Sequence, residues 1–503
     1  MRKESKFDDR ITSERALLLA YQNSGEDLPT EVQSLGEALF KNPRSPDELG
    51  AYRTANRRKA VTADLDVLNE YYQVLNKEVP SFLEAGPREW LFHDPQRVRA
   101  AIVTTGGVAP GLNCVVHGIV KRHWHTYNVN EAVEGGVLGV HESFLGLSSL
   151  EHHMKPLKPS DTEAWLDKGG SILGIRRYDP ELPGSEDMTD AEKRQALANN
   201  IAPQLMQSKI DILYVIGGDG SLSVAHDIAK RLNELNKKIS IVGIPKTMDN
   251  DVMWVWQSFG FRSAVEKATE VINNLNWEAE ATRRVCIIEL FGAESGFVAA
   301  NSTLASGHVD LVLVPEEFQA IKPEYYARAL NDYINYLIDK VSKLGTVNEN
   351  EKAHAVVVLA EGVGKILDKE GIKLGDSPIV KEHFTEQLTS YLKGRIKNKG
   401  GHDVEVFANQ PRHNIRAIQA NSQDQIYCER LGALAVDNAL AGYTDFMISQ
   451  WLTEYVLVPL ELVQGQNKRI PPQGIFWKQV VSSTGQPCIS NERYEGTART
   501  ADG

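Results

Sequence analysis

Short apolar runs rich in β-branched residues recur along the chain from Arg99 onward, and each is followed by glycine or polar residues. Runs of this length predict buried strands, and runs that are followed by a helical pattern are typical of a parallel α/β sheet. We therefore expect strands at residues 100–104, 212–216, 239–244, 285–290, 311–314 and 355–360.

Two other stretches have helical spacing of their apolar residues. The segment after Gly220 places apolar side chains on one face of a helix, namely Leu222, Ala225, Ile228, Ala229 and Leu232. Residues 1–95 are rich in charged and helix-forming types, with apolar positions near helical spacing at Leu65, Leu68, Tyr71, Tyr72 and Leu75. We expect a helical N-terminal extension there.

Polar composition predicts the irregular parts of the chain. Residues 179–192 and 348–352 are polar and favour loops, and the tail from Ser482 to Gly503 is expected to be loosely ordered.

Composition narrows the class of protein. A chain of 503 residues with 42% hydrophobic residues can form two or more domains. The net charge of -12 argues against nucleic-acid binding, although a small phosphate needs only a few basic groups and backbone amides. The charged start and the lack of an apolar run near ~18 residues predict no membrane partner. Four scattered cysteines without CxxC spacing fit a reducing cytoplasm.

The first candidate site is the glycine-rich turn at residues 104–113, between a predicted strand and a helical segment. Its glycines Gly106, Gly107 and Gly111 allow backbone amides to approach a phosphate closely. A tight connection without a ligand is an equal alternative on pattern alone. Neither a Walker A nor a GxGxxG motif occurs here, which disfavours a P-loop or a dinucleotide oxidoreductase.

The second candidate is the segment 216–221, where Gly218 and Gly220 flank Asp219 and Ser221 follows. The carboxylate of Asp219 could hold Mg²⁺ that bridges nucleotide phosphates, beside a helix N-terminus. The alternative is an aspartate that only caps the helix.

The third candidate is the loop 244–251, which follows the next predicted strand. Lys246, Thr247, Asp249 and Asp251 offer a general base, a metal contact and phosphate donors in one segment. A solvated polar turn is the alternative. Because strand ends in open α/β sheets meet at one edge, these three loops are the main candidates for a site.

In this order and at these separations, GGVAPGLN, GGDGS and PKTMDND resemble the three signature loops of the 6-phosphofructokinases. The similarity continues through residues 169–177, 284–292, 360–362 and 415–417, and covers roughly residues 98–460. The extension looks most like the longer ATP-dependent members of plants and trypanosomatids. The resemblance implies two Rossmann-like three-layer α/β domains with a helical N-terminal extension.

The resemblance also implies domain boundaries. They are an extension over 1–95, a nucleotide-binding domain over 96–262 that is completed by about 425–480, a sugar-phosphate-binding domain over 263–424, and a tail over 481–503.

The resemblance implies transfer of the γ-phosphate of ATP to the 1-hydroxyl of fructose 6-phosphate, with Asp249 as base. Asp219 and Asp251 are expected near Mg²⁺, and Thr247 and Arg177, with Lys246 beside them, near the transferring phosphate. The residues expected to bind the nucleotide are Gly106, Gly107, Gly111, Gly218, Gly220, Ser221 and Arg177.

For the sugar phosphate, the resemblance implies Glu361 at the hydroxyls and Arg284 and Arg416 at the 6-phosphate. Phe291 and Gly292, with Thr247, Asp249 and Asp251, complete that expected set. Since family members commonly lend basic residues to a neighbouring subunit's sugar site, a homo-oligomer, dimer or tetramer, is also implied.

Two positions bear on the phosphoryl donor. Gly220 stands where pyrophosphate-dependent relatives carry an aspartate that fills the space of the nucleotide α-phosphate. Lys246 is shared with those relatives, but the plant-like ATP enzymes show the same Gly-plus-Lys combination. We expect ATP, with pyrophosphate as the alternative.

Three positions depart from the family pattern. Ala293 stands where an arginine is expected near the reacting phosphate, Arg262 where an aspartate is usual, and Gln425 near an arginine of bacterial members. The missing arginine leaves open a further alternative, a regulatory or binding subunit with weak catalysis.

Overall fold

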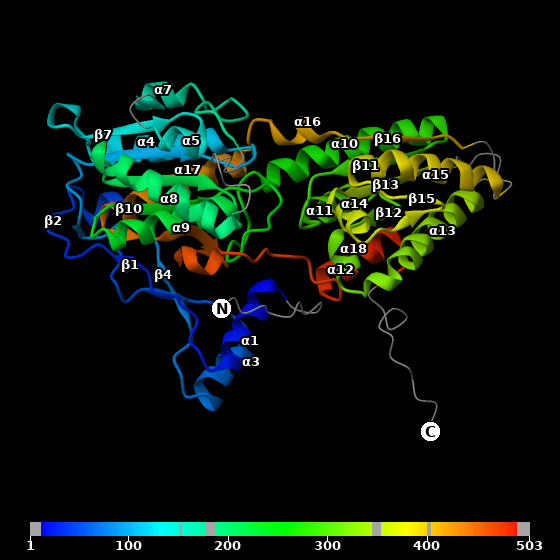
Figure 1. Cartoon of the computed structure of the whole chain (residues 1–503), viewed down its shortest axis with the longest axis horizontal. Coiled ribbons are helices and arrows are strands. Elements are labelled where there is room, and N and C mark those ends of the chain that lie inside the picture. Colours follow the sequence, from blue (N-terminus) through cyan, green and yellow to red (C-terminus); the bar gives the residue numbers. More distant parts are fainter. Residues whose placement is uncertain (1–11, 150–152, 177–187, 345–353, 400–403, 490–503) are drawn as a thin grey trace.

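The computed structural model describes residues 12–149, 153–176, 188–344, 354–399 and 404–489. Two α/β domains lie side by side, one built on a nine-stranded sheet and the other on a four-stranded sheet (Figure 1). We refer to them as the first and the second domain.

The sheet of the first domain is parallel at its centre and antiparallel at its edges. Its strands, in spatial order, are β3 (Arg58–Ala60), β4 (Ser81–Glu84), β19 (Glu454–Pro459), β18 (Phe446–Trp451), β10 (Ser240–Pro245), β9 (Ile212–Gly217), β6 (Arg99–Thr104), β7 (Gly136–Val140) and β8 (Met154–Pro156). The central neighbours β10, β9 and β6 run in the same direction, so their carboxyl ends meet at one edge.

Helices cover both faces of this sheet. Side chains on one face, such as Leu213, belong to a core shared with α8 and α9, whereas those on the other, such as Tyr214, pack with α4 and α17. Successive side chains along a strand point to opposite faces of the sheet, so each buried strand contributes residues to both cores. The helices are α4 (Leu112–Lys121), α8 (Asp190–Gln207), α9 (Asp219–Glu234) and α17 (Ser422–Leu440).

The second domain repeats this layering around four parallel strands, which are β12 (Leu311–Leu313), β13 (Ala355–Ala360), β11 (Val285–Leu290) and β16 (Val406–Asn409). Ile287 faces one helical layer and Ile288 the other. The first layer is α13 (Tyr326–Leu344), α14 (Gly362–Lys369) and α15 (Phe384–Asn398), and the second is α10 (Phe261–Thr282), α11 (Phe297–Ser306) and α18 (Ile475–Thr484). Within the described ranges, no helix is long and apolar enough to cross a bilayer.

The predicted fold class is confirmed: both domains are three-layer α/β sandwiches. The six predicted strands correspond to β6, β9, β10, β11, β12 and β13, and the helix expected after Gly220 is α9.

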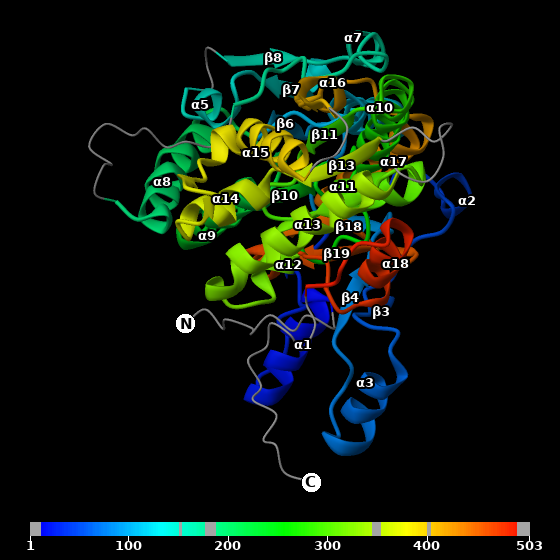
Figure 2. The same ribbon diagram turned by 90° about the vertical axis from the view of Figure 1, so that its right-hand side faces the viewer.

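The N-terminal extension differs from the expected helical segment. It contains the helices α1 (Ser13–Ser24), α2 (Pro46–Leu49) and α3 (Leu65–Asn69), of which α1 and α3 project from the body (Figures 1 and 2). It also supplies β3 and β4, which pair with each other and join the first sheet through β19. The extension is therefore part of the first domain's sheet.

The C-terminal expectations also need correction. Helix α18 packs on the second sheet, so the chain past about residue 470 does not complete the first domain. The tail is packed as far as Ile489, which is fully buried, and the Gln486 side chain hydrogen-bonds the backbone of Val312 (2.8 and 2.9 Å). Residues 490–503 lie outside the described part.

The two predicted loops are described only in part. Residues 348–352 and most of 179–192 lie outside the described ranges. The end of the predicted loop 179–192 is helical, because Thr189 and Glu192 form a capping box at the start of α8.

Candidate active site

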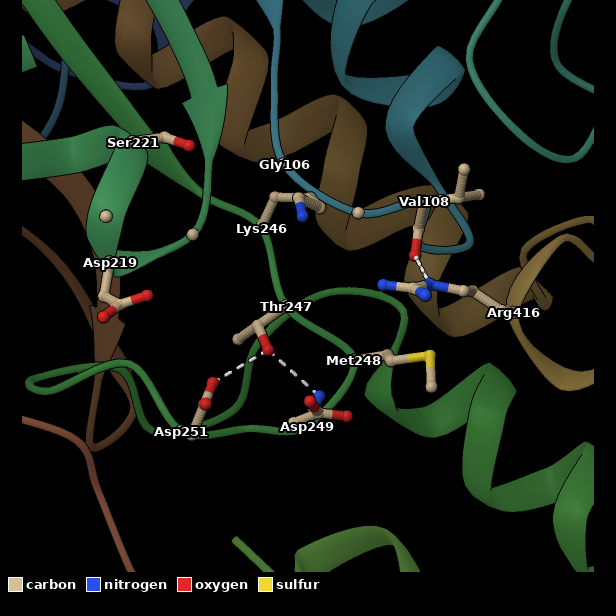
Figure 3. Close-up of a pocket in the computed structure, with 13 residues that line it drawn as sticks. Gly106, Val108, Asp219, Ser221, Lys246, Thr247, Met248, Asp249, Asp251 and Arg416 are labelled. Atoms are coloured by element: carbon tan, nitrogen blue, oxygen red, sulfur yellow. Dashed lines mark hydrogen bonds between the residues drawn. The ribbon is translucent and has the colours of Figure 1, made fainter. Parts of the chain in front are cut away.

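Three loops at the carboxyl ends of adjacent strands β6, β9 and β10 surround one cavity of about 320 Å³ (Figure 3). The short helix α16 (Arg412–Arg416) contributes its last residue from the second domain. The cavity is lined by Gly106, Gly107, Val108, Gly218, Asp219, Gly220, Ser221, Lys246, Thr247, Met248, Asp249, Asp251 and Arg416. Asp219 and Asp249 thus share one cavity, as the sequence predicts.

The glycine turn after β6 brings its backbone against two cations. Gly106 has a φ of +90°, and a Cβ there would lie 3.0 Å from the Lys246 ammonium. A Cβ on Gly107 would lie 1.9 Å from a guanidinium nitrogen of Arg416, so a side chain there would displace this guanidinium. Glycine at both positions therefore allows the two cations to lie directly against the turn.

Asp219 follows Gly218, which is the N-cap residue of α9. Asp219 therefore does not cap the helix, and its carboxylate points into the cavity (Figure 3). A Cβ on Gly220 would meet no atom of the described residues within 4 Å. The space beside Asp219 is open.

Thr247 organises the loop after β10. Its hydroxyl donates to Asp251 Oδ1 (2.8 Å) and accepts from the backbone N–H of Asp249 (3.0 Å), as Figure 3 shows. Ser295 donates to the backbone carbonyl of Asp249 (3.0 Å) from the second domain. These bonds hold the two aspartates in one turn that both domains support.

Asp249 is the carboxylate whose surroundings favour proton exchange. Burial raises its pKa to about 7, with the negative charges of Asp251 and Glu361 acting in the same direction and Arg416 and Lys246 opposing them. Its Oδ1 atom is buried and accepts no hydrogen bond from any described residue. A carboxylate with this pKa and an unused oxygen in a cavity is suited to act as a general base.

Burial also affects Lys246, one of the two cations of the cavity. Burial lowers the pKa of Lys246 to about 8, and the positive charge of Arg416 acts in the same direction. The nearby carboxylates oppose this shift. Arg416 donates from Nε to the Val108 carbonyl (2.9 Å), and its guanidinium lies 4.9 Å from the ring centroid of Phe291. Two cations thus face the cavity at the glycine turn, where a phosphate could bind.

A metal would be held by few protein groups. Within the described residues, no cluster of three or more His, Cys, Asp or Glu side chains could hold an ion. Asp219 and Asp251 both line the cavity, and the charge of Asp219 adds to burial in raising the pKa of Asp251. Such a pair fits Mg²⁺, which commonly takes one or two carboxylates and completes its shell with water and substrate phosphates.

A family model described as phosphofructokinase matches residues 99–439. The chain belongs to the phosphofructokinase family. As a member it is a phosphotransferase, and the resemblance recognised from the three loops is confirmed.

Three curated relatives carry the name ATP-dependent 6-phosphofructokinase. The protein of Borreliella burgdorferi is 33% identical over 483 residues, which cover 93% of this chain and 99% of that protein. The protein of Amycolatopsis methanolica is 30% identical and covers 91% and 94%. A chloroplastic protein of Arabidopsis thaliana is 32% identical and covers 80% and 68%, in line with the expected likeness to plant members.

Solved structures support the fold. A pyrophosphate-dependent phosphofructokinase from Marinobacter aquaeolei has a TM-score of 0.56 at 18% identity, with 74% of this chain and 85% of that chain covered. The phosphofructokinase of Pichia pastoris in the T-state has a TM-score of 0.55 at 21% identity, with 77% and 37% covered. At these identities the likeness shows only that the chain has the phosphofructokinase fold.

Some residues expected at the sugar site lie next to the cavity without lining it. Glu361 is close enough for its charge to raise the pKa of Asp249, and Phe291 stacks on Arg416. Gly292 has a φ of +134°, and its carbonyl accepts from the N–H of Gly362 (3.0 Å). These residues form the second domain's side of the site.

Two further expected site residues among those described do not line the cavity. Gly111 is the N-cap of α4, where a Cβ would lie 2.5 Å from Cys428 Sγ, so its role in the described chain is packing. Arg284 precedes β11, at the opposite end of the strand from Phe291, and pairs with Glu405 (3.1 Å). Arg177 lies outside the described residues.

Two of the three departures from the family pattern have structural partners. Arg262 of α10 hydrogen-bonds Gln423 of α17, and Gln425 donates to the carbonyl of Ala420 (2.8 Å) beside the start of α17. Ala293 lies in the turn after β11, where Gly362 packs against its carbonyl. Neither Arg262 nor Gln425 reaches the cavity.

The sequence reasoning missed some residues that shape the site. Val108 and Met248 line the cavity, and Ser295 anchors Asp249. The first two lie inside recognised motifs and could have been included on that ground. Ser295 carries no pattern that distinguishes it from other loop serines.

Proposed function

We propose that this protein is an ATP-dependent 6-phosphofructokinase. It transfers the γ-phosphate of ATP to the 1-hydroxyl of fructose 6-phosphate and yields fructose 1,6-bisphosphate and ADP. The observation that carries the proposal is the buried Asp249 carboxylate, with its unused oxygen, in a cavity that also holds two cations and two further aspartates. The names of the three relatives described above include the words ATP-dependent, which supports ATP as the phosphoryl donor.

In this proposal Asp249 accepts the proton of the sugar hydroxyl as the oxygen attacks the γ-phosphorus. Lys246 stabilises charge on the transferring phosphate, and the amides of Gly106 and Gly107 lie beside the donor phosphates. Thr247 keeps the base in place through the Asp249 amide. Positioning and charge neutralisation account for most of the catalysis expected of such a site.

Asp219 and Asp251 are the residues that would hold Mg²⁺. The ion would supply positive charge to the donor phosphates when bound. Ser221, Gly218 and Gly220 would lie along the nucleotide, together with Arg177.

The sugar phosphate would lie toward the second domain. Glu361 would hold sugar hydroxyls beside Phe291 and Gly292, and Arg416 would contact the 6-phosphate together with an Arg284 supplied by a neighbouring subunit. This arrangement requires a homo-oligomer. A glycolytic role and a cytoplasmic location belong to the same proposal.

The decisive experiment offers the purified protein fructose 6-phosphate with MgATP or with magnesium pyrophosphate. Formation of fructose 1,6-bisphosphate with ATP is the expected result. Turnover with pyrophosphate alone would favour the rival donor, which the presence of Lys246 permits. Binding of ATP without turnover with either donor would favour a regulatory subunit, an outcome to which Ala293 lends weight.

Gly220→Asp tests the donor assignment directly. The open space at Gly220 would receive a carboxylate, which would repel and obstruct the α-phosphate of ATP. We expect kcat/KM for ATP to fall at least about tenfold. The control is Gly394→Asp on α15, at an exposed glycine that also has no described atom near its Cβ position. Unchanged ATP kinetics in Gly220→Asp would contradict the donor assignment.

A further inference from the structure

The segment between η6 (Leu460–Val463) and α18 crosses from the first domain to the second (Figure 1). Three consecutive backbone N–H groups in it donate to three different parts of the molecule: Lys468 to the carbonyl of Asp251 (2.7 Å), Arg469 to the hydroxyl of Ser13 (3.0 Å) and Ile470 to the carboxylate of Glu316 (3.1 Å). This short segment therefore joins the loop after β10, which carries Asp249 and Asp251, to the first turn of α1 and to α12 (Pro315–Gln319) of the second domain.

The side chain of Lys468 also contacts the loop after β10 and the residues that follow it. It is buried, and its ammonium donates to Asn250 Oδ1 (3.1 Å) and to the carbonyls of Val255 (2.5 Å) and Trp256 (3.3 Å). Asn250 has a φ of +57°, and its Oδ1 also accepts from the N–H of Ser258 (3.0 Å). The lysine thus joins the turn between the two aspartates to the segment that follows it.

The N-terminal helix supplies the opposite charge. Glu14 on the first turn of α1 is buried, and the hydroxyl of its neighbour Ser13 accepts from the N–H of Arg469, which holds this turn against the segment that carries Lys468. Burial raises the pKa of Glu14. Among the influences that lower this pKa, the positive charge of Lys468 is the largest. Burial likewise lowers the pKa of Lys468 to about 8, with Glu14 as its main charged support. Each ion therefore reduces the cost of burying the other.

We propose that Lys468 and Glu14 are a positioning pair that holds residues 249–256 in the conformation seen in the cavity. The N-terminal helix is then a functional part of the site, although neither side chain lines the cavity. Lys468 acts through its hydrogen bonds to Asn250, Val255 and Trp256, and Glu14 supplies the compensating charge. The inference rests on the proposed function, because it takes Asp249 as the base whose position matters.

Lys468→Met tests the pair, since methionine keeps an unbranched chain and removes three hydrogen bonds. We expect kcat to fall at least about tenfold while KM for ATP and for fructose 6-phosphate stays within about threefold. Hydrogen exchange of peptides covering 249–258 should be faster, with the rest of the protein unchanged. The matched control is Lys478→Met at an exposed position of α18.

Glu14→Gln provides the milder variant in case Lys468→Met does not fold. It keeps the size of the side chain and removes the charge that compensates Lys468, so we expect a fall of about threefold in kcat and faster exchange in the same peptides. Glu37→Gln, at an exposed position of the same extension, is its control.

Unchanged kcat and unchanged exchange in Glu14→Gln would overturn the positioning pair, as would faster exchange spread over the whole molecule. Absence of kinase activity in the unaltered protein would instead overturn the proposed function. Hydrogen exchange would still decide whether the pair orders the loop, so the two failures are distinguishable.

Discussion

At the scale of single residues, the geometry around Asp249 explains how a carboxylate can accept a proton near neutral pH. Asp249→Ser removes the carboxylate and leaves the backbone bonds of the loop to Thr247 and Ser295 available. We expect kcat to fall at least about 100-fold while ATP binding, measured by calorimetry, is retained. Asp376→Ser, at an exposed aspartate, serves as the control. Near-normal turnover of Asp249→Ser would remove this residue from the mechanism.

The pKa values at the site predict a bell-shaped pH profile. The base works when it has lost its proton, so kcat/KM should rise with pH through about 7, the value to which burial raises the pKa of Asp249. Lys246 stabilises phosphate when it is protonated, so kcat/KM should fall again as pH passes about 8, the value to which burial lowers its pKa. The two values belong to a group of interacting charges and will be measured as apparent constants. A profile that is flat from pH 6 to 9 would contradict both assignments.

At the scale of elements, the sequence predicted the buried strands well and the edge strands poorly. Residues 285–290 and 355–360 are strands with those same bounds, since their runs are rich in β-branched residues and apolar except for Glu289. In contrast, β3 is Arg58–Ala60, a short polar edge strand whose pattern carries no apolar signal. Its pairing with β4 is a long-range contact that local sequence cannot reveal.

The same limit explains the outcome at the site. The motif residues Asp219, Lys246 and Asp249 were predicted because each follows a recognisable strand. Lys468 was not, because its importance arises from burial beside a loop more than 200 residues earlier in the chain.

One buried carboxylate pairs with three cations within the extension. Glu84 of β4 pairs with Arg53 (2.5 Å), Arg57 (2.9 Å) and Lys59 (3.7 Å). Glu84→Gln leaves these cations with less compensation, so we expect unfolding free energy to fall by about 1–3 kcal/mol, measured by urea denaturation. The control is Glu454→Gln, which removes an exposed partner of the same Lys59 and should change stability by less than about 1 kcal/mol. Equal effects would contradict a special role for Glu84.

At the scale of the whole molecule, the two domains depend on each other at the cavity. The first domain supplies Asp219 and Asp249, and the second supplies Arg416 and the Ser295 hydroxyl that fixes the Asp249 backbone. Arg284, at the far end of β11, is too remote in the chain's own fold to line this cavity. If it binds the sugar phosphate, it must do so at the cavity of another copy.

A complementation experiment tests whether Arg284 serves the cavity of another copy. Arg284→Ala keeps the base and loses the lent arginine, whereas Asp249→Ser keeps the arginine and loses the base, so each homo-oligomer should be weakly active. Co-expression with two different affinity tags would yield hybrids in which an Arg284→Ala pocket receives Arg284 from its Asp249→Ser neighbour. Those sites are complete, and at sugar phosphate well below the KM of the Arg284→Ala protein the purified hybrid should exceed the activity of either parent at least about tenfold. A hybrid no more active than the average of its parents would mean that each chain builds its sugar site alone, and the ion pair between Arg284 and Glu405 would then be structural.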